Sequence, residues 1–325
     1  MGQRGTGVAG RRMPERWSEA VRERRGDGRV LLRTAGLGIV DVHCCEDRTG
    51  FAGPGCEDMY GVVLTRAGSY LRRVNGEEFF VDSTGGYVMC PGDEHLIAHP
   101  VGPGDRSTIL QCDRDLFNDL FVERSSRRHV LVDGVTDLRH RALVAAARRG
   151  ADPFELAERA HVLLDAVAGA ASQEAAGRPQ RTASLRTAAL RTTTQRAHRR
   201  IAADACAVLA ARTAYPPVPA LGELAREIGV SPHHLSRVFR AVTGRTLTAY
   251  RNALRVRAVL QAIEEGQWGL RALAATHGFA DQAHLTRVMR QYTGSLPSAV
   301  REQLAPYGGQ LATRPDRARI FNAGR

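Results

Sequence analysis

The sequence predicts an α+β protein of two domains, with a β-rich front half and an all-helical rear half. The first observation behind this prediction is a change of charge: residues 29–120 carry 8 arginines against 14 acidic residues, whereas residues 172–325 carry 23 against 9. The second is a series of short apolar runs between residues 29 and 112, separated by Gly, Pro or Asn-Gly, which is typical of strands. The third is an internal repeat between residues 221 and 301, which predicts two copies of one helical unit.

The charge of the chain predicts a polyanionic partner. The 325 residues carry a net charge of +12, and all 46 basic residues are arginine. Codon bias in a GC-rich gene accounts for the absence of lysine, but it acts on the whole gene and cannot separate an acidic front from a basic rear. The basic rear is therefore the candidate for binding nucleic acid, and the helix-turn-helix signals described below narrow this to double-stranded DNA. The alternative is a nucleoid-type protein that binds by charge alone and has equal affinity for every sequence.

The composition also predicts the compartment. The chain has no run of about 18 uncharged apolar residues, so we expect no membrane span. Residues 1–28 are rich in Gly and Arg and lack an apolar core, so we expect no secretory signal. Six cysteines in so long a chain do not form a secreted disulfide framework. The expected location is the cytoplasm.

The front domain is expected over residues 29–120 as a β-sandwich or barrel. Its apolar or alternating runs include residues 38–42, 60–64 and 86–89. Short strands at this spacing are typical of both architectures. The dipeptide Asn75-Gly76 lies between two runs and indicates a type I′ hairpin turn.

A helical element is expected over residues 121–171, with a dimerisation or packing role. Asp152-Pro153 is a cap followed by a first-turn proline, so it predicts the start of a helix over residues 154–171. This helix has an apolar stripe at helical spacing. The stripe either pairs across a two-fold axis in a homodimer or packs on the barrel of the same chain. Its members are Leu156, Leu163, Leu164 and Val167.

Three segments are expected outside the packed domains. Residues 1–28 are predicted to be a flexible basic arm, and residues 305–325 a basic C-terminal tail. Residues 172–200 consist mainly of Ala, Ser, Thr, Gln and Arg, with few large apolar side chains. This composition predicts a solvated, Arg-rich linker, helical in part.

The rear domain, expected over residues 201–304, contains the repeat. A Leu-Ala-x-x-x-Gly run that begins at Leu224 recurs 49 residues later at Leu273. A His-Leu-x-Arg-Val-x-Arg run that begins at His234 recurs 50 residues later at His284. The alternative to a true repeat is an unrelated helical bundle with a chance similarity.

Each copy has the local signals of a helix-turn-helix. A glycine, Gly229 or Gly278, ends the first helix, where a left-handed residue is needed. The second helix begins at Ser231-Pro232 in one copy and after Asp281 in the other, with the side chain as the N-cap. Apolar residues at i, i+3 and i+4 face the core, so the polar positions of the second helix face outward, toward a DNA major groove. A long helix over residues 248–265 joins the two copies.

On these residues the rear domain resembles the DNA-binding domain of the AraC/XylS-type (arabinose-regulator) family of bacterial transcription factors. It departs from the family pattern at Met289, where Phe is usual, and at Leu247, the first-copy position that corresponds to Pro297. The resemblance covers residues 200–304. It rests on the Leu-Ala-x3-Gly, Leu-Ser-Arg-x-Phe-Arg and Thr-Gly runs of the first copy and on Gly278-Phe279, Leu285-Thr286-Arg287, Gly294-x-x-Pro297 and Arg301 of the second.

The resemblance implies which side chains contact DNA, and these agree with the outward faces predicted from the spacing. Arginine binds guanine bidentately, glutamine pairs with adenine, and an alanine or threonine methyl contacts the thymine methyl. The base-reading positions are His233, Ser236 and Arg237 in the first copy and Gln282, Ala283, Thr286 and Arg287 in the second. Phosphate contacts are expected from Arg240, Arg251 and Arg290.

The front half resembles the cupin-like β-barrel that many family members carry as their effector-binding domain. The resemblance rests on the glycines of residues 61–68, on Asn75-Gly76, and on the Gly, Pro and His pattern of residues 85–95. A small barrel can hold one small ligand. We expect the effector pocket to include Tyr60, Tyr70, Tyr87 and His95.

The expected function is therefore a sequence-specific transcriptional regulator under small-molecule control, with activation as the family's commoner mode. Its expected partners are DNA, the effector, RNA polymerase and a second copy of the chain. No cofactor, metal or enzyme activity is expected.

The alternative function is a metal- or thiol-dependent sensor, or an enzyme of the metal-cupin or DNA-repair methyl-acceptor type, in the front domain. That domain does hold thiol and imidazole groups, which suit zinc or a redox switch. However, it lacks both His-x-His and Cys-x-x-Cys pairs, and a buried cysteine commonly behaves as an inert apolar residue. The candidate groups are Cys44, Cys45, Cys56, Cys90, Cys112, His43, His95 and His99.

Overall fold

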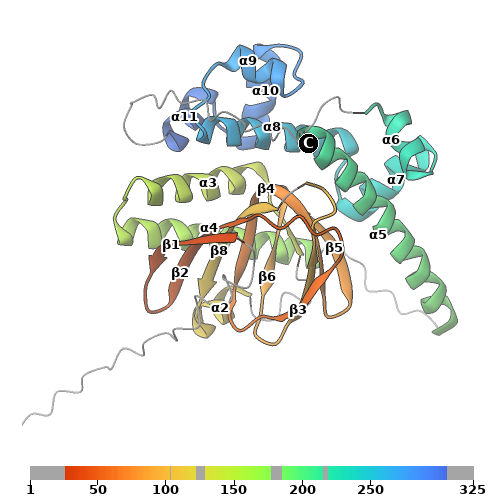
Figure 1. Cartoon of the computed structure of the whole chain (residues 1–325), viewed down its shortest axis with the longest axis horizontal. Helices are drawn as coiled ribbons and strands as arrows, with labels where there is room; N and C mark the ends of the chain where they lie inside the picture. The colour runs from red at the N-terminus through yellow and green to blue at the C-terminus, as the bar shows by residue number, and fades with distance from the viewer. Residues whose placement is uncertain (1–25, 103, 122–128, 177–184, 215–218, 306–325) are drawn as a thin grey trace, which may run out of the picture.

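The computed structural model describes residues 26–102, 104–121, 129–176, 185–214 and 219–305. The front half is a curled antiparallel sheet with helices against it, and the rear half is all helical (Figure 1). The predicted α+β class is confirmed.

No helix in the described ranges is long and apolar enough to cross a membrane. Residues 1–25 of the predicted arm, and the predicted tail from residue 306, lie outside the described residues. The end of the predicted arm, residues 26–28, instead begins the first strand, which pairs with the second.

The sheet curls because its longest strand belongs to two sets of pairs. The first half of β4 pairs with β8 and β6, and its second half pairs with β5 and β7. The register of β4 against β8 shifts between Thr65 and Ala67, where the strand changes partners. The strands are β1 (Gly26–Arg33), β2 (Leu37–Cys44), β3 (Ala52–Cys56), β4 (Tyr60–Val74), β5 (Glu77–Asp82), β6 (Gly85–Met89), β7 (Glu94–Ala98), β8 (Asp105–Cys112) and β9 (His129–Leu131).

The hairpin between β4 and β5 has the predicted turn. Asn75 and Gly76 have φ angles of 47° and 81°. Two consecutive positive φ angles define the type I′ turn, whose twist matches that of the flanking strands. The Asn-Gly signal therefore predicted both the position and the type of this connection.

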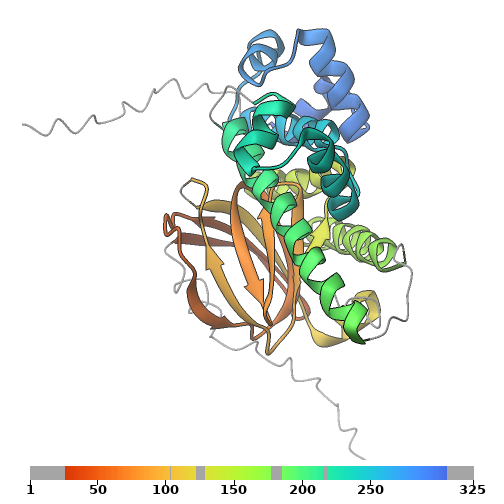
Figure 2. The ribbon, with the colours of Figure 1, turned by 90° about the vertical axis from the view of Figure 1, so that its right-hand side faces the viewer.

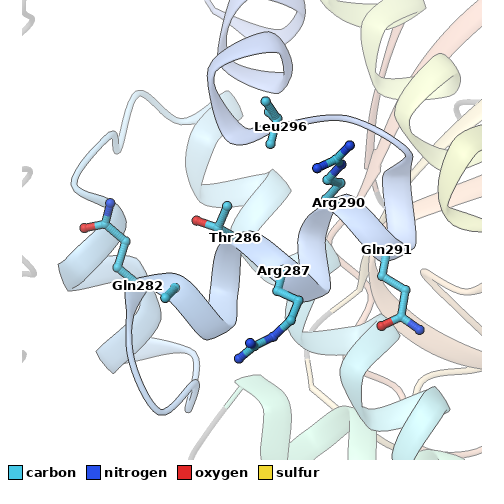
Figure 3. A pocket seen from close by; sticks show the side chains of 7 residues that line it. Gln282, Thr286, Arg287, Arg290, Gln291 and Leu296 are labelled. Atoms are coloured by element: carbon cyan, nitrogen blue, oxygen red, sulfur yellow. The ribbon is translucent and has the colours of Figure 1, made fainter.

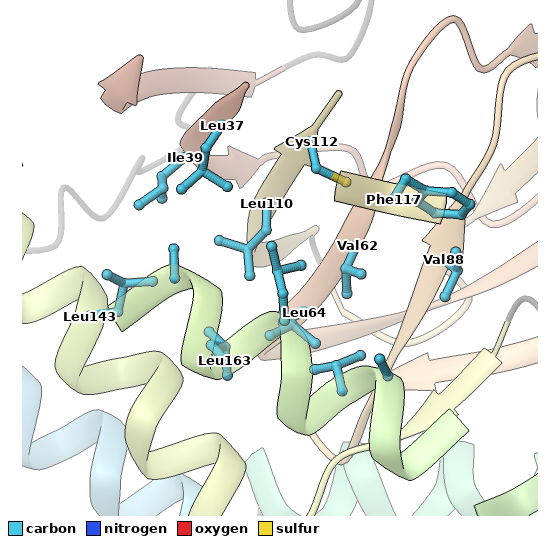
Figure 4. Packing of buried hydrophobic residues seen from close by; sticks show 14 of the residues in the cluster. Leu37, Ile39, Val62, Leu64, Val88, Leu110, Cys112, Phe117, Leu143 and Leu163 are labelled. Carbon is cyan, nitrogen blue, oxygen red and sulfur yellow. The ribbon is translucent and has the colours of Figure 1, made fainter. Parts of the chain in front are cut away.

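One face of the sheet is covered by α4 (Pro153–Ala176) and the other faces the barrel interior. The apolar stripe of α4 packs with Val62, Leu64 and Leu110 of the sheet (Figure 4). All four predicted members of the stripe are at most 3% exposed. Of the two alternatives for this stripe, the structure therefore supports packing on the chain's own sheet.

The rear half contains two small helical cores that share one long helix. The first core joins α5, α6 and α7 to the front part of α8, and the second joins the rest of α8 to α9, α10 and α11. The helices are α2 (Arg114–Phe121) and α3 (Gly134–Arg148), which lie with the front half, α5 (Leu185–Ala214), α6 (Leu221–Ile228), α7 (Pro232–Thr243), α8 (Leu247–Glu264), α9 (Leu270–Thr276), α10 (Gln282–Thr293) and α11 (Pro297–Leu304).

The predicted linker needs correction. Residues 172–176 belong to α4 and residues 185–200 to α5, so the expected boundary at residue 200 falls inside a helix. The described parts of this segment, residues 172–176 and 185–200, are helical, in agreement with the expectation of partial helicity and with the high helix propensity of Ala, Arg and Gln. In Figure 2, α5 runs beside the barrel toward the helical half, and it contacts β5 as well as α7.

Candidate nucleic-acid interface

The first helix-turn-helix, α6 and α7, has the local geometry that the sequence predicts. Gly229 ends α6 with a φ of 79°, in the left-handed region. The Ser231 hydroxyl accepts a hydrogen bond from the His234 N–H over 3.2 Å, and Pro232 is the first residue of α7. The buried face of α7 consists of Leu235, Val238 and Phe239. These contacts fix which side of α7 is free to meet DNA.

The second helix-turn-helix, α9 and α10, repeats this geometry with different side chains. Gly278 follows α9 with a φ of 71°. The Asp281 carboxylate accepts a hydrogen bond from the His284 N–H over 2.7 Å and so caps α10. Leu285 and Met289 are fully buried. Met289 therefore fills the core position at which the family usually has Phe.

The predicted contact residues of α7 lie together on one surface. His233, Arg237 and Arg240 are exposed and Ser236 is half-buried. They line one surface hollow, and Arg251 of α8 reaches it from the neighbouring helix. The hollow thus collects all five side chains that were predicted to meet DNA from this half.

The predicted contact residues of α10 line a second hollow, which Figure 3 shows from close by. Gln282, Ala283, Arg287 and Arg290 are exposed, and Thr286 is half-buried between them. Gln291 and Leu296 line the same hollow, and the sequence had not singled them out. Two equivalent surfaces therefore carry the predicted groups, one on each recognition helix.

The arginines on these surfaces are free cations. Within the described ranges, none of Arg237, Arg240, Arg251, Arg287 and Arg290 has a carboxylate within ion-pair distance. A guanidinium outside an internal ion pair can bind guanine or phosphate oxygens without first breaking such a pair. Arg237 does contact a neutral partner, since its Nη2 lies 3.3 Å from Nδ1 of His234. The surface is therefore electrostatically suited to DNA.

The predicted effector residues do not form one group. Tyr60 stacks on Phe117 of α2, with ring centroids 4.6 Å apart, and packs with the core on the helix-covered face of the sheet. Tyr70 and Tyr87 belong to the core on the opposite face. Tyr60 and Tyr70 lie on opposite faces, although both are even-numbered positions of β4, because the register shift between Thr65 and Ala67 reverses the alternation of the strand.

The interior face holds a buried cation that the sequence did not suggest. Arg72 of β4 is fully buried, donates to Glu57 over 2.9 Å, and lies 4.1 Å from the centre of the Tyr87 ring. His95 Nδ1 is 3.3 Å from the same Glu57 carboxylate. Among the described residues, Nε and Nη1 of Arg72 and the Tyr87 hydroxyl have no hydrogen-bond partner. A buried hydrogen-bond donor without a partner costs folding free energy, and a bound ligand with acceptor atoms would remove that cost. This cluster is therefore a candidate ligand site.

The cysteines of the front domain are mostly apart. Cys45 and Cys56 are exposed, whereas Cys44 and Cys112 are buried, and none of the six cysteines forms a disulfide. Burial raises the pKa of the Cys112 thiol to about 12, with smaller contributions from Asp113 and Cys90. Within the described ranges, only Cys44 belongs to a group of three potential metal ligands, together with His99 and Asp105. The sequence analysis had named Cys44 and His99 as candidate ligands and had missed Asp105.

Sequence reasoning also missed a buried ion network that joins the two halves. Arg141 of α3 donates to Asp137 over 3.1 Å and to Glu264 of α8 over 2.8 Å. Arg257 of α8 lies 3.2 Å from Asp137 and donates to the Val132 carbonyl over 2.7 Å. Burial alone would lower the pKa of Arg141, but Asp137 and Glu264 raise it above its usual value, so the guanidinium stays charged.

Two further contacts fix the same interface. Leu138 and Ala142 of α3 are part of the core of the second helix-turn-helix. At the other end of α8, the Tyr250 hydroxyl donates to the carboxylate of Asp82, the last residue of β5. The helix that joins the two recognition units is thus held by the front half near both of its ends.

Comparisons with known proteins support this assignment of the rear half. A family described as a helix-turn-helix domain matches residues 224–303. A probable transcription factor, PqrA of Proteus vulgaris, is 29% identical over 79 residues, and the match covers 24% of this chain and 65% of that protein. The chain therefore spans about two thirds of the length of this curated relative.

Solved structures of regulators are also similar to this chain. ToxT from Vibrio cholerae with a bound unsaturated fatty acid has a TM-score of 0.31 at 10% identity, over 83% of this chain and 95% of that one. An AraC-type transcriptional regulator from Chromobacterium violaceum has a TM-score of 0.31 at 21% identity, over 34% of this chain and 98% of that one. Together with the geometry above, the match over residues 224–303 shows that the chain carries a helix-turn-helix domain there.

Proposed function

We propose that this protein is a transcriptional regulator that reads a specific DNA site with two recognition helices. The observation that carries the proposal is the pair of equivalent surfaces on α7 and α10, each with a capped helix N-terminus and with arginines that have no carboxylate partner among the described residues. Such helices place the side chains of their N-terminal part against base edges in the major groove. Base-reading roles are proposed for His233, Ser236, Arg237, Gln282, Ala283, Thr286 and Arg287.

The rigid connection between the two helices supports a composite site. Val256, Val259 and Leu260 of α8 are fully buried, so this helix cannot bend freely. Two recognition helices held by one linker helix are expected to enter major-groove segments about one turn, roughly 10 base pairs, apart. Arg240, Arg251 and Arg290 are proposed to hold the flanking phosphates, which set the register but carry no sequence information.

The front half is proposed to control DNA binding through a small-molecule effector. The buried donors of Arg72 and Tyr87 support a ligand that carries acceptor atoms, and a carboxylate is the group that a guanidinium binds most strongly. An effector in the barrel would alter the position of α8 through Asp82 and the α3 network, and so bias the arrangement of the two recognition helices. We propose activation as the outcome, with RNA polymerase and a second copy of the chain as partners in the cytoplasm.

The proposal is tested by selection of bound duplexes from a randomised pool, followed by affinity measurements on the enriched duplex and its scrambled counterpart. We expect the enriched duplex to bind about 10³-fold more tightly or better at physiological salt. Equal affinity for the two duplexes would leave binding by charge alone and would contradict sequence reading. A promoter reporter that carries the enriched site then shows whether the protein raises transcription.

A further inference from the structure

A cluster of three metal-ligand side chains lies at the end of the barrel near Cys44. Cys44 ends β2 and Asp105 begins β8, and the two are direct cross-strand partners in the β2–β8 register. His99 follows β7, and its backbone N–H donates to the Arg48 carbonyl over 2.8 Å, which fixes the loop. All three side chains are buried, with at most 8% of each residue exposed. The backbone thus brings three chain segments to one point.

The distances within the cluster match those of a bound metal ion. Nε2 of His99 is 3.2 Å from Asp105 Oδ1 and 3.9 Å from Cys44 Sγ. In a tetrahedral zinc site, the bond lengths to nitrogen, oxygen and sulfur place such ligand atoms about 3.3 Å and about 3.6 Å apart. One ring nitrogen therefore faces both other ligands, at a separation from Asp105 that matches a shared ion and at a separation from Cys44 that is about 0.3 Å longer.

The donor set selects the class of ion. A thiolate and an imidazole prefer zinc and the neighbouring transition metals, whereas magnesium and calcium require mostly oxygen ligands. Three protein ligands with a fourth position left for water or an added ligand are typical of zinc sites that do more than stabilise a fold. The set differs from the His-rich triad of metal cupins and draws on one cysteine only.

The surroundings of the cluster fix its carboxylate. The Ser107 hydroxyl donates to Oδ2 of Asp105, which leaves Oδ1 directed at His99. The Thr65 hydroxyl lies 3.2 Å from Ser107 and 3.4 Å from the Tyr70 hydroxyl, so the hydrogen-bonded chain continues into the barrel. Hydrogen bonds to the ligands in this outer layer orient metal sites and tune their affinity.

We propose that Cys44, His99 and Asp105 bind one divalent transition-metal ion of the zinc class. The metal would use the Cys44 thiolate, Nε2 of His99 and Oδ1 of Asp105, and the thiol proton would pass to solvent on binding. The site adjoins the rear half, because Arg106, the residue after the ligand Asp105, donates to Glu265 at the end of α8 over 3.0 Å. The ion is therefore placed where it can influence the DNA-binding helices.

The test uses the full chain after treatment with a chelator and a thiol reductant. Co²⁺ is added first as a spectroscopic probe, and Zn²⁺ is then titrated in competition with a chelating dye. We expect one equivalent of metal per chain, with thiolate-to-cobalt charge-transfer absorption that Zn²⁺ abolishes. Saturable binding without that absorption, or no saturable binding of either ion by the wild-type chain, would overturn the proposal.

Variants identify the ligands. Cys44→Ala is expected to remove the charge-transfer absorption, and His99→Gln to weaken Zn²⁺ by more than the roughly 10–100-fold that loss of an outer-layer hydrogen bond costs. Cys45→Ser is the matched control, because this neighbouring thiol is exposed and outside the cluster, and it is expected to bind like the wild type. Unchanged binding by Cys44→Ala would refute the site. If Cys44→Ala does not fold, the site is tested by two other results: the thiolate-to-cobalt absorption of the wild type and the loss of Zn²⁺ affinity in His99→Gln.

Discussion

Arg141 of α3 donates a hydrogen bond to Glu264 of α8 over 2.8 Å, and both side chains are buried, at 0% and 7% exposure. This ion pair connects the helix that follows the barrel to the helix that joins the two recognition units. The same guanidinium reaches the Arg66 carbonyl of β4 over 2.6 Å. One side chain of α3 therefore contacts both the sheet and the DNA-binding half.

Removal of the carboxylate at the centre of this network is expected to be severely destabilising. Asp137 is fully buried between Arg141 and Arg257. Asp137→Ala therefore leaves two buried guanidinium groups without the carboxylate that they share. The expected loss is about 3–5 kcal/mol in the free energy of unfolding, measured by urea denaturation. The matched control is Glu155→Ala, which breaks an exposed ion pair with Arg159 and is expected to cost under about 0.5 kcal/mol. Similar midpoints for the two variants would contradict the central role of Asp137.

A buried histidine in the network is expected to make stability fall at mildly acidic pH. The pKa of His140 is well below its usual value because of burial, and because Arg66 of β4, the adjacent Arg141 of α3 and Arg257 of α8 repel a proton. Above pH 6.5 the group is neutral in the folded and the unfolded chain and has no effect. Below that value only the unfolded chain gains the proton, so folding loses about 1.4 kcal/mol per pH unit.

His140→Gln is the comparison for this effect, since glutamine does not titrate. Chemical denaturation at several pH values between 5 and 7.5 is expected to show a shallower decline for the variant than for the wild type. Parallel curves would show that His140 does not take up a proton on unfolding.

The apolar stripe of α4 is expected to stabilise the single chain. Leu163 is fully buried against the sheet, so Leu163→Ala is expected to cost about 2–5 kcal/mol through lost burial and a cavity. Because the contacts lie within one chain, the loss should not depend on protein concentration. Val162→Ala, at a neighbouring position that is 50% exposed, is expected to change stability by under about 0.5 kcal/mol. A loss for Leu163→Ala that shrinks as the concentration rises would point to a dimer interface instead.

Arg240 is expected to contact a phosphate without reading sequence. Arg240→Ala should weaken binding to the selected and the scrambled duplex to a similar extent, and lower the slope of log affinity against log salt by about 1. Arg114→Ala on α2 removes the same charge, from the end of the barrel away from the helical half (Figure 1), and should leave the slope nearly unchanged. A loss confined to the selected duplex would instead assign a base contact to Arg240.

The sequence predicted those parts of the structure that local chemistry determines. Asn75-Gly76 set a turn type, Ser231 and Asp281 capped the two recognition helices, and Gly229 ended α6 in a left-handed conformation. Each of these signals acts within four residues along the chain, so no knowledge of the tertiary structure is needed to interpret it. The predicted DNA-contact residues came from the family resemblance, and the local signals agreed with them, because the caps and the apolar spacing fix which face of each helix is outward.

The parts that sequence reasoning missed depend on contacts between distant segments. Asp137 and Arg141 form an i, i+4 pair that is typical of a solvated helix surface, and only the position of α8 shows that they are buried. Asp105 joins Cys44 through strand register, which the spacing along the chain does not reveal. Tyr60 was placed in the effector pocket because the sequence does not show which face of β4 meets the helices.

The central claim is that α7 and α10 each read bases at one of two neighbouring sites on the same DNA. Its most direct test measures the relative affinity of wild type, Arg237→Ala and Arg287→Ala for every single-base-pair variant of the selected duplex. We expect each variant to cost roughly 1–3 kcal/mol and to lose discrimination at about one base pair. The two affected base pairs should lie about one helical turn, roughly 10 base pairs, apart. Equal losses on the selected and the scrambled duplex, with discrimination unchanged at every position, would contradict base reading by these helices.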